Sequence, residues 1–125
     1  MPTPWPLLGP LVEPLLGAPY GAYDCGNLLF HLFKVGWGLD LTRDPECLSR
    51  EFVEVWFQGD PRPPLGLVQP WDCLIVSVHG VVGDHYGLVM EGTQFVHSGK
   101  AGVVIDRLQR WEAKVLQIAR LRRLV

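Results

Sequence analysis

The sequence predicts an α+β domain in which the helices come first and the strands follow. Leu28, Leu29, Leu32 and Phe33 recur at helical spacing in the first half of the chain. In the second half, short β-branched segments are separated by glycine-rich turns, as in an antiparallel meander. Segregation of this kind favours helices packed on one face of a sheet. The chain has 125 residues, of which 48% are hydrophobic, so we expect one domain with one core over residues 1–125.

The first helix is expected from about Cys25 to Val35. Residues 1–18 before it are a proline-rich lead-in, expected to be irregular or briefly helical and to pack its leucines on the domain. Asp24 is suited to cap the helix, because its carboxylate can accept a hydrogen bond from a first-turn N–H. Glycines soon after Val35 end the helical pattern.

A second helix is expected to start at Asp44-Pro45 and to continue to Gly59, because apolar side chains keep a helical spacing through this segment. Its cysteine, Cys47, is interpreted as part of the core. Residues 60–66 are predicted to form a loop, since three prolines there remove backbone donors and favour extended geometry.

Five short strands are expected after this loop, at residues 74–78, 86–90, 94–97, 102–105 and 115–118. Residues 91–93 are interpreted as a three-residue hairpin loop that pairs Met90 with Gln94. His85 and His97 would then project from one face of the sheet as near-diagonal neighbours. A loop one residue longer or shorter would separate the two imidazoles.

Composition excludes several classes of partner. The net charge is −2 and only 19% of residues are charged, so no basic surface indicates a nucleic-acid partner. The longest apolar runs are far below the roughly 20 residues of a membrane helix, and we expect no membrane span. The first residues lack the charged start and continuous apolar stretch of a signal peptide. We therefore expect a protein present in the cytoplasm when it is synthesised.

The three cysteines cannot close a complete set of intramolecular disulfides and show no Cys-x-x-Cys spacing, so free thiols are expected. One set of zinc ligands is conceivable by residue type alone: Cys73, His79, His85 and His97. Its spacing matches no closed zinc motif, and we expect no metal site. Cys73 is interpreted as core instead, and His79 as structural.

Cys25 is the candidate nucleophile. A thiol attacks as the thiolate, and the free N–H groups and partial positive charge at a helix start lower a thiol pKa. The plainer interpretation is a small buried hydrophobe. Asp24 before it and the two downstream histidines favour catalysis. His85 can take the thiol proton, and His97 can hold the far nitrogen of His85, as a carboxylate or amide does in other triads.

These residues resemble the NlpC family of papain-like cysteine peptidases. That family carries Asp-Cys at a helix start, Pro-Gly-Asp before a strand, then His-x-Gly and a later histidine. The matching segments here are Asp24-Cys25, Gln69-Pro70-Trp71-Asp72, His85-Tyr86-Gly87 and Phe95-Val96-His97. The spacing between the histidines also matches, and residues 102–108 resemble the family's next strand. The resemblance covers most of the chain from about Pro19 onward.

The resemblance implies a papain-like NlpC-type fold, with N-terminal helices packed on an antiparallel sheet of about five strands. It also implies a cysteine endopeptidase that cleaves the stem peptides of bacterial peptidoglycan through a Cys25–His85–His97 triad, without a cofactor. Tyr20 resembles the family tyrosine whose hydroxyl lines the site near the oxyanion, and Asp24 would support it.

Two departures from the family pattern could alter the shape of the substrate site. Gly26-Asn27 replace the small or aromatic residues that usually follow the cysteine, and Trp71 stands where the family has the glycine of Pro-Gly-Asp.

The segments Leu16–Gly21 and Gly38–Leu41 are most similar to the phage tail-assembly branch of this family. This similarity implies a virion tail-tip component that acts at the host cell wall and contacts tail hub proteins. Two alternatives stay open: a structural tail-tip module with a silent peptidase fold, and a thiol amidase or acyltransferase. A basic C-terminal end is interpreted as a solvated tail or a docking contact and comprises Arg120, Arg122 and Arg123.

Overall fold

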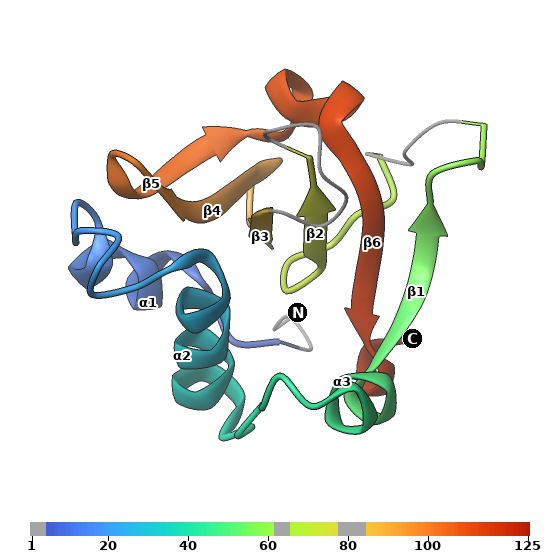
Figure 1. Cartoon of the computed structure of the whole chain (residues 1–125), viewed down its shortest axis with the longest axis horizontal. Helices are drawn as coiled ribbons and strands as arrows, with labels where there is room; N and C mark the ends of the chain where they lie inside the picture. The colour runs from blue at the N-terminus through green and yellow to red at the C-terminus, as the bar shows by residue number, and fades with distance from the viewer. Residues whose placement is uncertain (1–4, 62–65, 78–84) are drawn as a thin grey trace.

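The computed structural model describes residues 5–61, 66–77 and 85–125 and confirms the α+β fold (Figure 1). The helices are α1 (Gly9–Val12), α2 (Cys25–Trp37) and α3 (Pro45–Glu51), with the short 3-10 segments η1 (Glu13–Leu15), η2 (Leu108–Lys114) and η3 (Arg122–Leu124). The strands are β1 (Phe52–Phe57), β2 (Cys73–Val76), β3 (His85–Met90), β4 (Gln94–Gly99), β5 (Gly102–Arg107) and β6 (Val115–Leu121).

These strands form an antiparallel sheet in the order β1-β6-β2-β3-β4-β5. Parts of the expected 60–66 loop and 74–78 strand, together with His79, lie outside the described residues. Within the described part of the chain, no helix is both long and apolar enough to cross a membrane.

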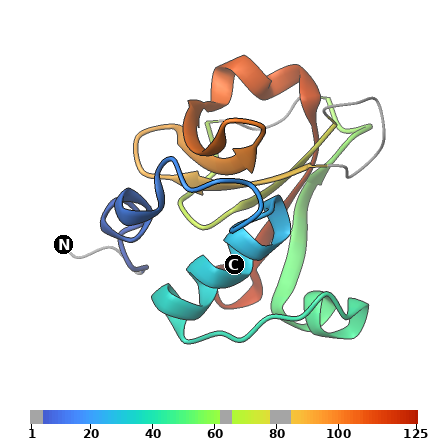
Figure 2. The same ribbon diagram turned by 60° about the vertical axis from the view of Figure 1, so that its left-hand side comes forward.

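Each face of the sheet has its own hydrophobic core. On one face, α2 contributes Leu28, Leu32 and Phe33, which pack with side chains of β3 and β4 such as Leu88 and Val96. On the opposite face, alternate residues of the same strands pack beneath η2. Figures 1 and 2 show α1 and α2 on one side of the sheet, with α3 beside β1. A residue's position along β3 or β4 therefore decides which core it joins, because side chains alternate between faces.

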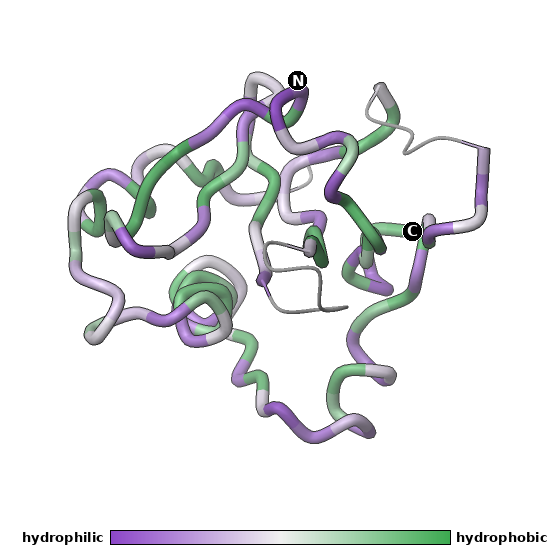
Figure 3. The backbone as a smooth tube through the Cα atoms, turned by 45° about the horizontal axis from the view of Figure 1, so that its top comes forward, coloured by the Kyte–Doolittle hydropathy of each residue, from purple (hydrophilic) through white to green (hydrophobic). Residues whose placement is uncertain are grey.

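Helix α2 starts where the sequence predicts and ends two residues later than expected. Asp24 is its N-cap, with the carboxylate accepting from the Asn27 N–H at 2.7 Å. Gly38 ends the helix in the left-handed conformation, with φ of 65°. Figure 3 shows α2 as a mostly hydrophobic coil, followed by a stretch in which hydrophobic and hydrophilic residues alternate before α3. The caps and the apolar face explain why this helix could be predicted from the sequence.

The expected second helix is wrong beyond Glu51. Helix α3 stops there, and residues 52–57 form β1, which pairs with β6 from Phe52 opposite Leu121 to Phe57 opposite Gln117. The segment is rich in Val and aromatic residues, which favour strands, and its partners in β6 lie sixty or more residues away. The sheet consequently has six described strands instead of about five.

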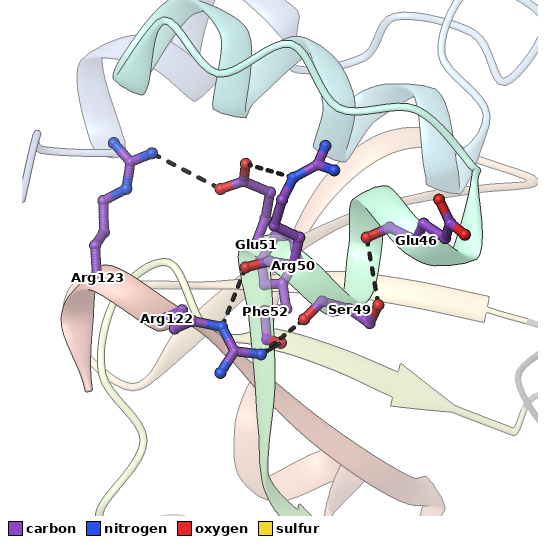
Figure 4. Close-up of polar contacts among 7 residues, drawn as sticks. All are labelled: Glu46, Ser49, Arg50, Glu51, Phe52, Arg122 and Arg123. Atoms are coloured by element: carbon purple, nitrogen blue, oxygen red, sulfur yellow. Dashed lines mark hydrogen bonds and ion pairs between the residues drawn. The ribbon is translucent and has the colours of Figure 1, made fainter.

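Arg122 stabilises the change from α3 to β1 (Figure 4). Its guanidinium donates to the carbonyl oxygens of Ser49 at 2.7 Å, Arg50 at 3.1 Å and Phe52 at 3.2 Å. The last carbonyls of a helix lack partners within the helix, so Arg122 satisfies groups that would otherwise need water. Arg123 lies 3.8 Å from a carboxylate oxygen of Glu51. These arginines fasten the C-terminus to the fold, which corrects their interpretation as a solvated tail.

Trp71 adopts a conformation that normally requires glycine. Its φ is 76°, and it is completely buried. The indole Nε1 donates to the carbonyl of Pro6 at 2.8 Å, and the ring packs against Phe33 and Trp37. Left-handed backbone costs a non-glycine residue about 1–2 kcal/mol, and burial of the ring offsets that cost. Trp71 therefore packs in the core and holds the N-terminal segment through Pro6, and it has no exposed surface with which to touch a substrate.

The Trp71 ring also explains a glycine inside α2. A Cβ atom at Gly36 would lie 2.5 Å from the ring. We expect Trp71→Gly to lower the free energy of unfolding by about 2 kcal/mol, since lost burial worth about 3–5 kcal/mol exceeds the strain relieved. Gly36→Ala should destabilise the parent chain but stabilise the Trp71→Gly variant, because alanine is the better helix former. Urea unfolding of the two single variants and the double variant measures this coupling, and additive effects would contradict it.

Candidate active site

Cys25 is the first residue of α2 and is half-buried. The first N–H groups of an α-helix have no acceptor within the helix and carry a partial positive charge. The Asp24 carboxylate accepts a hydrogen bond from the N–H of Asn27. The N–H groups of Cys25 and Gly26 also belong to the first turn and have no acceptor within the helix. The position therefore combines a thiol with the donors that a developing oxyanion needs.

The residues around this helix start explain the unusual Gly26-Asn27 pair. The Asn27 amide donates to Asp24 Oδ2 at 3.2 Å, and Arg43 Nη2 lies 3.2 Å from Asp24 Oδ1. A Cβ atom at residue 26 would lie 2.6 Å from the Arg43 guanidinium, so glycine leaves room for that arginine. Because the ion pair is exposed, its contribution to stability is small. Its main effect is to fix the side chain of Asp24 beside the helix start.

Tyr20 lies beside the thiol. The negative charge of the Cys25 thiolate raises the pKa of Tyr20 above its ordinary value, and burial and the charge of Asp24 act in the same direction. The hydroxyl therefore stays protonated and can donate a hydrogen bond at this site.

His85 and His97 form a directly bonded pair. The hairpin places Met90 opposite Gln94 and Gly87 opposite His97, so His85 is a diagonal neighbour of His97. The Nε2 atom of His85 lies 2.8 Å from Nδ1 of His97. Both residues are buried, with exposed fractions of 8% and 6%. This arrangement confirms the predicted loop length and its consequence for the two imidazoles.

Aromatic rings fix the orientation of the histidine pair. Phe95 stacks on His97 with ring centres 4.8 Å apart, and Trp111 of η2 lies 5.0 Å from His97 and 6.0 Å from His85. A Cβ atom at Gly87 would lie 2.6 Å from the Phe95 ring. The glycine of the His-x-Gly segment therefore makes room for the ring that supports His97. Neither Trp111 nor Phe95 was assigned a role from the sequence.

The thiol and the imidazoles come from two layers of the fold. The strand register puts His85 and His97 on the face beneath η2, whereas α2 covers the other face. Two features bring the layers together at one end of the sheet. His85 is the first residue of β3, and Ser98 Oγ donates to the carbonyl of Tyr23, two residues before Cys25. The start of α2 is thereby tied to the strand that carries His97.

An acidic residue that the sequence analysis did not single out completes this cluster. Asp106 Oδ2 lies 2.7 Å from Nε2 of His97. In the strand register Val104 is opposite His97, so Asp106 is on the same face and two residues further along β5. Asp106 follows four apolar or small residues of β5, which gave a signal in the sequence, but the register of β4 with β5 is what connects it to His97.

The three conceivable zinc ligands that the structure describes are separated by the sheet. Cys73 is opposite Leu88, on the face covered by α2, whereas His85 and His97 project from the other face. Burial raises the pKa of Cys73, with the charge of Asp72 acting in the same direction, so this thiol stays neutral. Among the residues that the structure describes, no group of three or more His, Cys, Asp or Glu is arranged to hold a metal. Cys47 and Cys73 are both buried, as expected for core cysteines.

A pocket of about 260 Å³ lies next to the start of α2. Gly26, Arg43 and Tyr86 border it, and its interior is apolar, with Leu29 and Phe30 of α2 facing Ile75 of β2. It lies on the α2 side of the sheet, one residue from the candidate nucleophile. A bound substrate can therefore place an apolar group beside Cys25.

Comparison with known proteins identifies the fold. No protein-family model matches the sequence, and no curated protein matches it significantly. The NlpC/p60 domain of the peptidoglycan hydrolase SagA superposes with a TM-score of 0.57 and 16% identity, over 86% of this chain and 90% of that one. An NLP/P60 family protein from Staphylococcus aureus, described as similar to a lipoprotein, gives 0.55 and 18%, over 84% of this chain and 34% of that one. The chain therefore has the papain-like α+β fold of NlpC/p60 domains.

Proposed function

We propose that this protein is a cysteine peptidase of the NlpC/p60 type that hydrolyses stem peptides of peptidoglycan. The observation that carries the proposal is the 2.8 Å hydrogen bond between His85 and His97, on strands tied to the helix start that bears Cys25. A thiol at the start of a helix and a buried imidazole held by a second polar group are the parts of a thiol acyl-transfer site. The fold shared with a peptidoglycan hydrolase domain supports the choice of substrate.

In the proposed reaction, His85 takes the thiol proton, and Sγ of Cys25 attacks the carbonyl carbon of the scissile amide. The tetrahedral intermediate places its oxyanion at the start of α2, near the Tyr20 hydroxyl. Each well-placed donor contributes roughly 3 kcal/mol in comparable sites. His85 then protonates the leaving amine, which departs and leaves a thioester on Cys25. Water, deprotonated by His85, attacks this thioester and releases the second product with the free thiol.

The reaction needs a close approach of two atoms. Nε2 of His85 is bonded to His97, so the remaining nitrogen, Nδ1, must accept the thiol proton. Because His85 begins β3, its ring lies at an end of the sheet, where a helix terminus from the other layer can come within reach. We expect Sγ of Cys25 within about 3–4 Å of Nδ1 in the substrate-bound enzyme.

We further propose that the protein acts as part of a phage tail tip, at the cell wall of the host. The support is the similarity of Leu16–Gly21 and Gly38–Leu41 to the tail-assembly branch. In the structure, the backbone of Gly17 and Ala18 is hydrogen-bonded to Val103 of β5, so this lead-in is an integral part of the domain.

Digestion of purified peptidoglycan tests the proposed function. We expect soluble fragments whose masses identify hydrolysis of an amide bond within the stem peptide, without added metal or cofactor. Mass spectrometry of the released fragments also reports which bond is cut. Intact stem peptides after prolonged digestion, from protein shown to be folded by circular dichroism, would contradict the proposal. Products that carry an added amine acceptor instead of water would favour an acyltransferase.

A further inference from the structure

Asp106 extends the histidine pair into a chain of three bonded groups. His97 is engaged at both ring nitrogens: Nδ1 lies 2.8 Å from Nε2 of His85, and Nε2 lies 2.7 Å from Oδ2 of Asp106. The chain runs across β3, β4 and β5 on one face of the sheet. Asp106 is more exposed than the histidines, with 28% of its side chain accessible.

The chemistry of these groups assigns each proton. An ionised carboxylate only accepts hydrogen bonds, so Nε2 of His97 must carry the hydrogen that it donates to Asp106. A neutral imidazole carries one hydrogen, so Nδ1 of His97 has a lone pair and accepts from Nε2 of His85. The hydrogen of His85 is then on Nε2, and its lone pair is on Nδ1.

The aromatic ring that lies over His97 cannot compete for these hydrogen bonds. Phe95 has no hydrogen-bonding group and covers the face of the imidazole. The enclosure of both histidines limits the water that could exchange protons with them. In a buried network the proton positions follow from the groups present, and of the three bonded groups Asp106, His97 and His85, only the carboxylate is restricted to accepting.

We propose that Asp106 is a positioning residue that fixes the tautomers of both histidines, so that His85 presents an unprotonated Nδ1. The assignment of tautomers stands on geometry alone, whereas its effect on catalysis rests on the proposed function. Asp106 touches neither the thiol nor the substrate and acts through His97.

The decisive variant is Asp106→Asn, which keeps the size of the side chain. Its amide can donate to Nε2 of His97, which moves the hydrogen of His97 to Nδ1 and forces Nε2 of His85 to accept. His85 then carries its hydrogen on Nδ1 and cannot take the thiol proton. Asp106→Glu keeps an acceptor-only group, and Asp40→Asn removes an exposed carboxylate elsewhere as the matched control.

Long-range ¹H–¹⁵N spectra of histidine-labelled protein distinguish the tautomers without any substrate. We expect hydrogen on Nε2 of both His85 and His97 in the parent chain, Asp40→Asn and Asp106→Glu, and on Nδ1 of both rings in Asp106→Asn. Hydrogen on Nδ1 of His97 in the parent chain would overturn the inference, and so would an unchanged spectrum in Asp106→Asn. The spectrum of the parent chain tests the inferred tautomers even if a variant does not fold.

Activity and thiol reactivity give the second measurement. For Asp106→Asn we expect kcat on peptidoglycan fragments to fall about 10²- to 10⁴-fold with little change in KM, in line with tautomer-reversing changes in other triads. The rate of Cys25 alkylation should depend on pH in Asp40→Asn as it does in the parent chain. That pH dependence should be lost in Asp106→Asn. If the parent chain cuts no peptidoglycan but the tautomers change as described, the proposed function fails and the inference about Asp106 holds.

Discussion

Replacing Cys25 with alanine should abolish hydrolysis of peptidoglycan fragments, with kcat lowered by about 10⁵- to 10⁶-fold, as for loss of the nucleophile in comparable triads. In the proposed mechanism the acyl intermediate forms on this thiol. The fold should persist, because the thiol is only half-buried and alanine is an excellent helix former at this position. Fragment release by mass spectrometry, with circular dichroism of the same sample, measures both effects.

Cys47→Ala is the matched control for this substitution. Cys47 is buried in α3, so the variant loses some packing but should keep its activity. A Cys25→Ala variant that digests peptidoglycan at the parent rate would eliminate the thiol mechanism. Equal losses in the two variants would show that the effect comes from folding and not from chemistry.

Replacing Arg120 with alanine should lower the free energy of unfolding by about 3–5 kcal/mol, because it leaves a buried carboxylate without its cation. Arg120 binds Asp72 through two hydrogen bonds, at 2.8 and 2.9 Å, and Asp72 is completely buried. These hydrogen bonds raise the pKa of Arg120, so the guanidinium stays charged at any pH at which the protein is handled. Asp72 also accepts from the N–H of Gln69, which fixes the turn before β2.

Urea unfolding of Arg120→Ala and of Arg110→Ala separates this ion pair from general charge effects. Arg110 is exposed on η2, and its loss should change stability by about 0.5 kcal/mol or less. A double variant that also carries Asp72→Ala should recover part of the loss, since the unpaired charge is gone. A cost below about 1 kcal/mol for Arg120→Ala, as for an exposed pair, would contradict the prediction.

Features that depend on neighbouring residues were predictable from the sequence. The Asp24 cap and the apolar stripe of α2 are local patterns, and both are present in the structure. The three-residue loop after Met90 fixes which residues of β3 and β4 face each other. The diagonal placement of His85 and His97 therefore followed from the number of residues between each histidine and the loop. Their catalytic roles, and that of Cys25, stay predictions.

The errors occurred where distant segments meet. Residues 52–57 keep an apolar spacing that fits a helix, but pairing with β6 and the Arg122 contacts at the end of α3 make them a strand. Trp71 takes a position that favours glycine because Gly36 and Phe33 of α2 leave a space that its ring fills.

The sequence by itself determined the α+β class, the start of the cysteine-bearing helix and the pairing of the two histidines, because periodicity, capping and turn length act over a few residues. Only the tertiary structure decided that β1 is a strand, that Trp71 is core, and that Asp106 bonds to His97. The first two outcomes depend on contacts between segments far apart in the chain, and the third depends on the register of the β4–β5 hairpin, which places Asp106 opposite Phe95 on the face that carries His97.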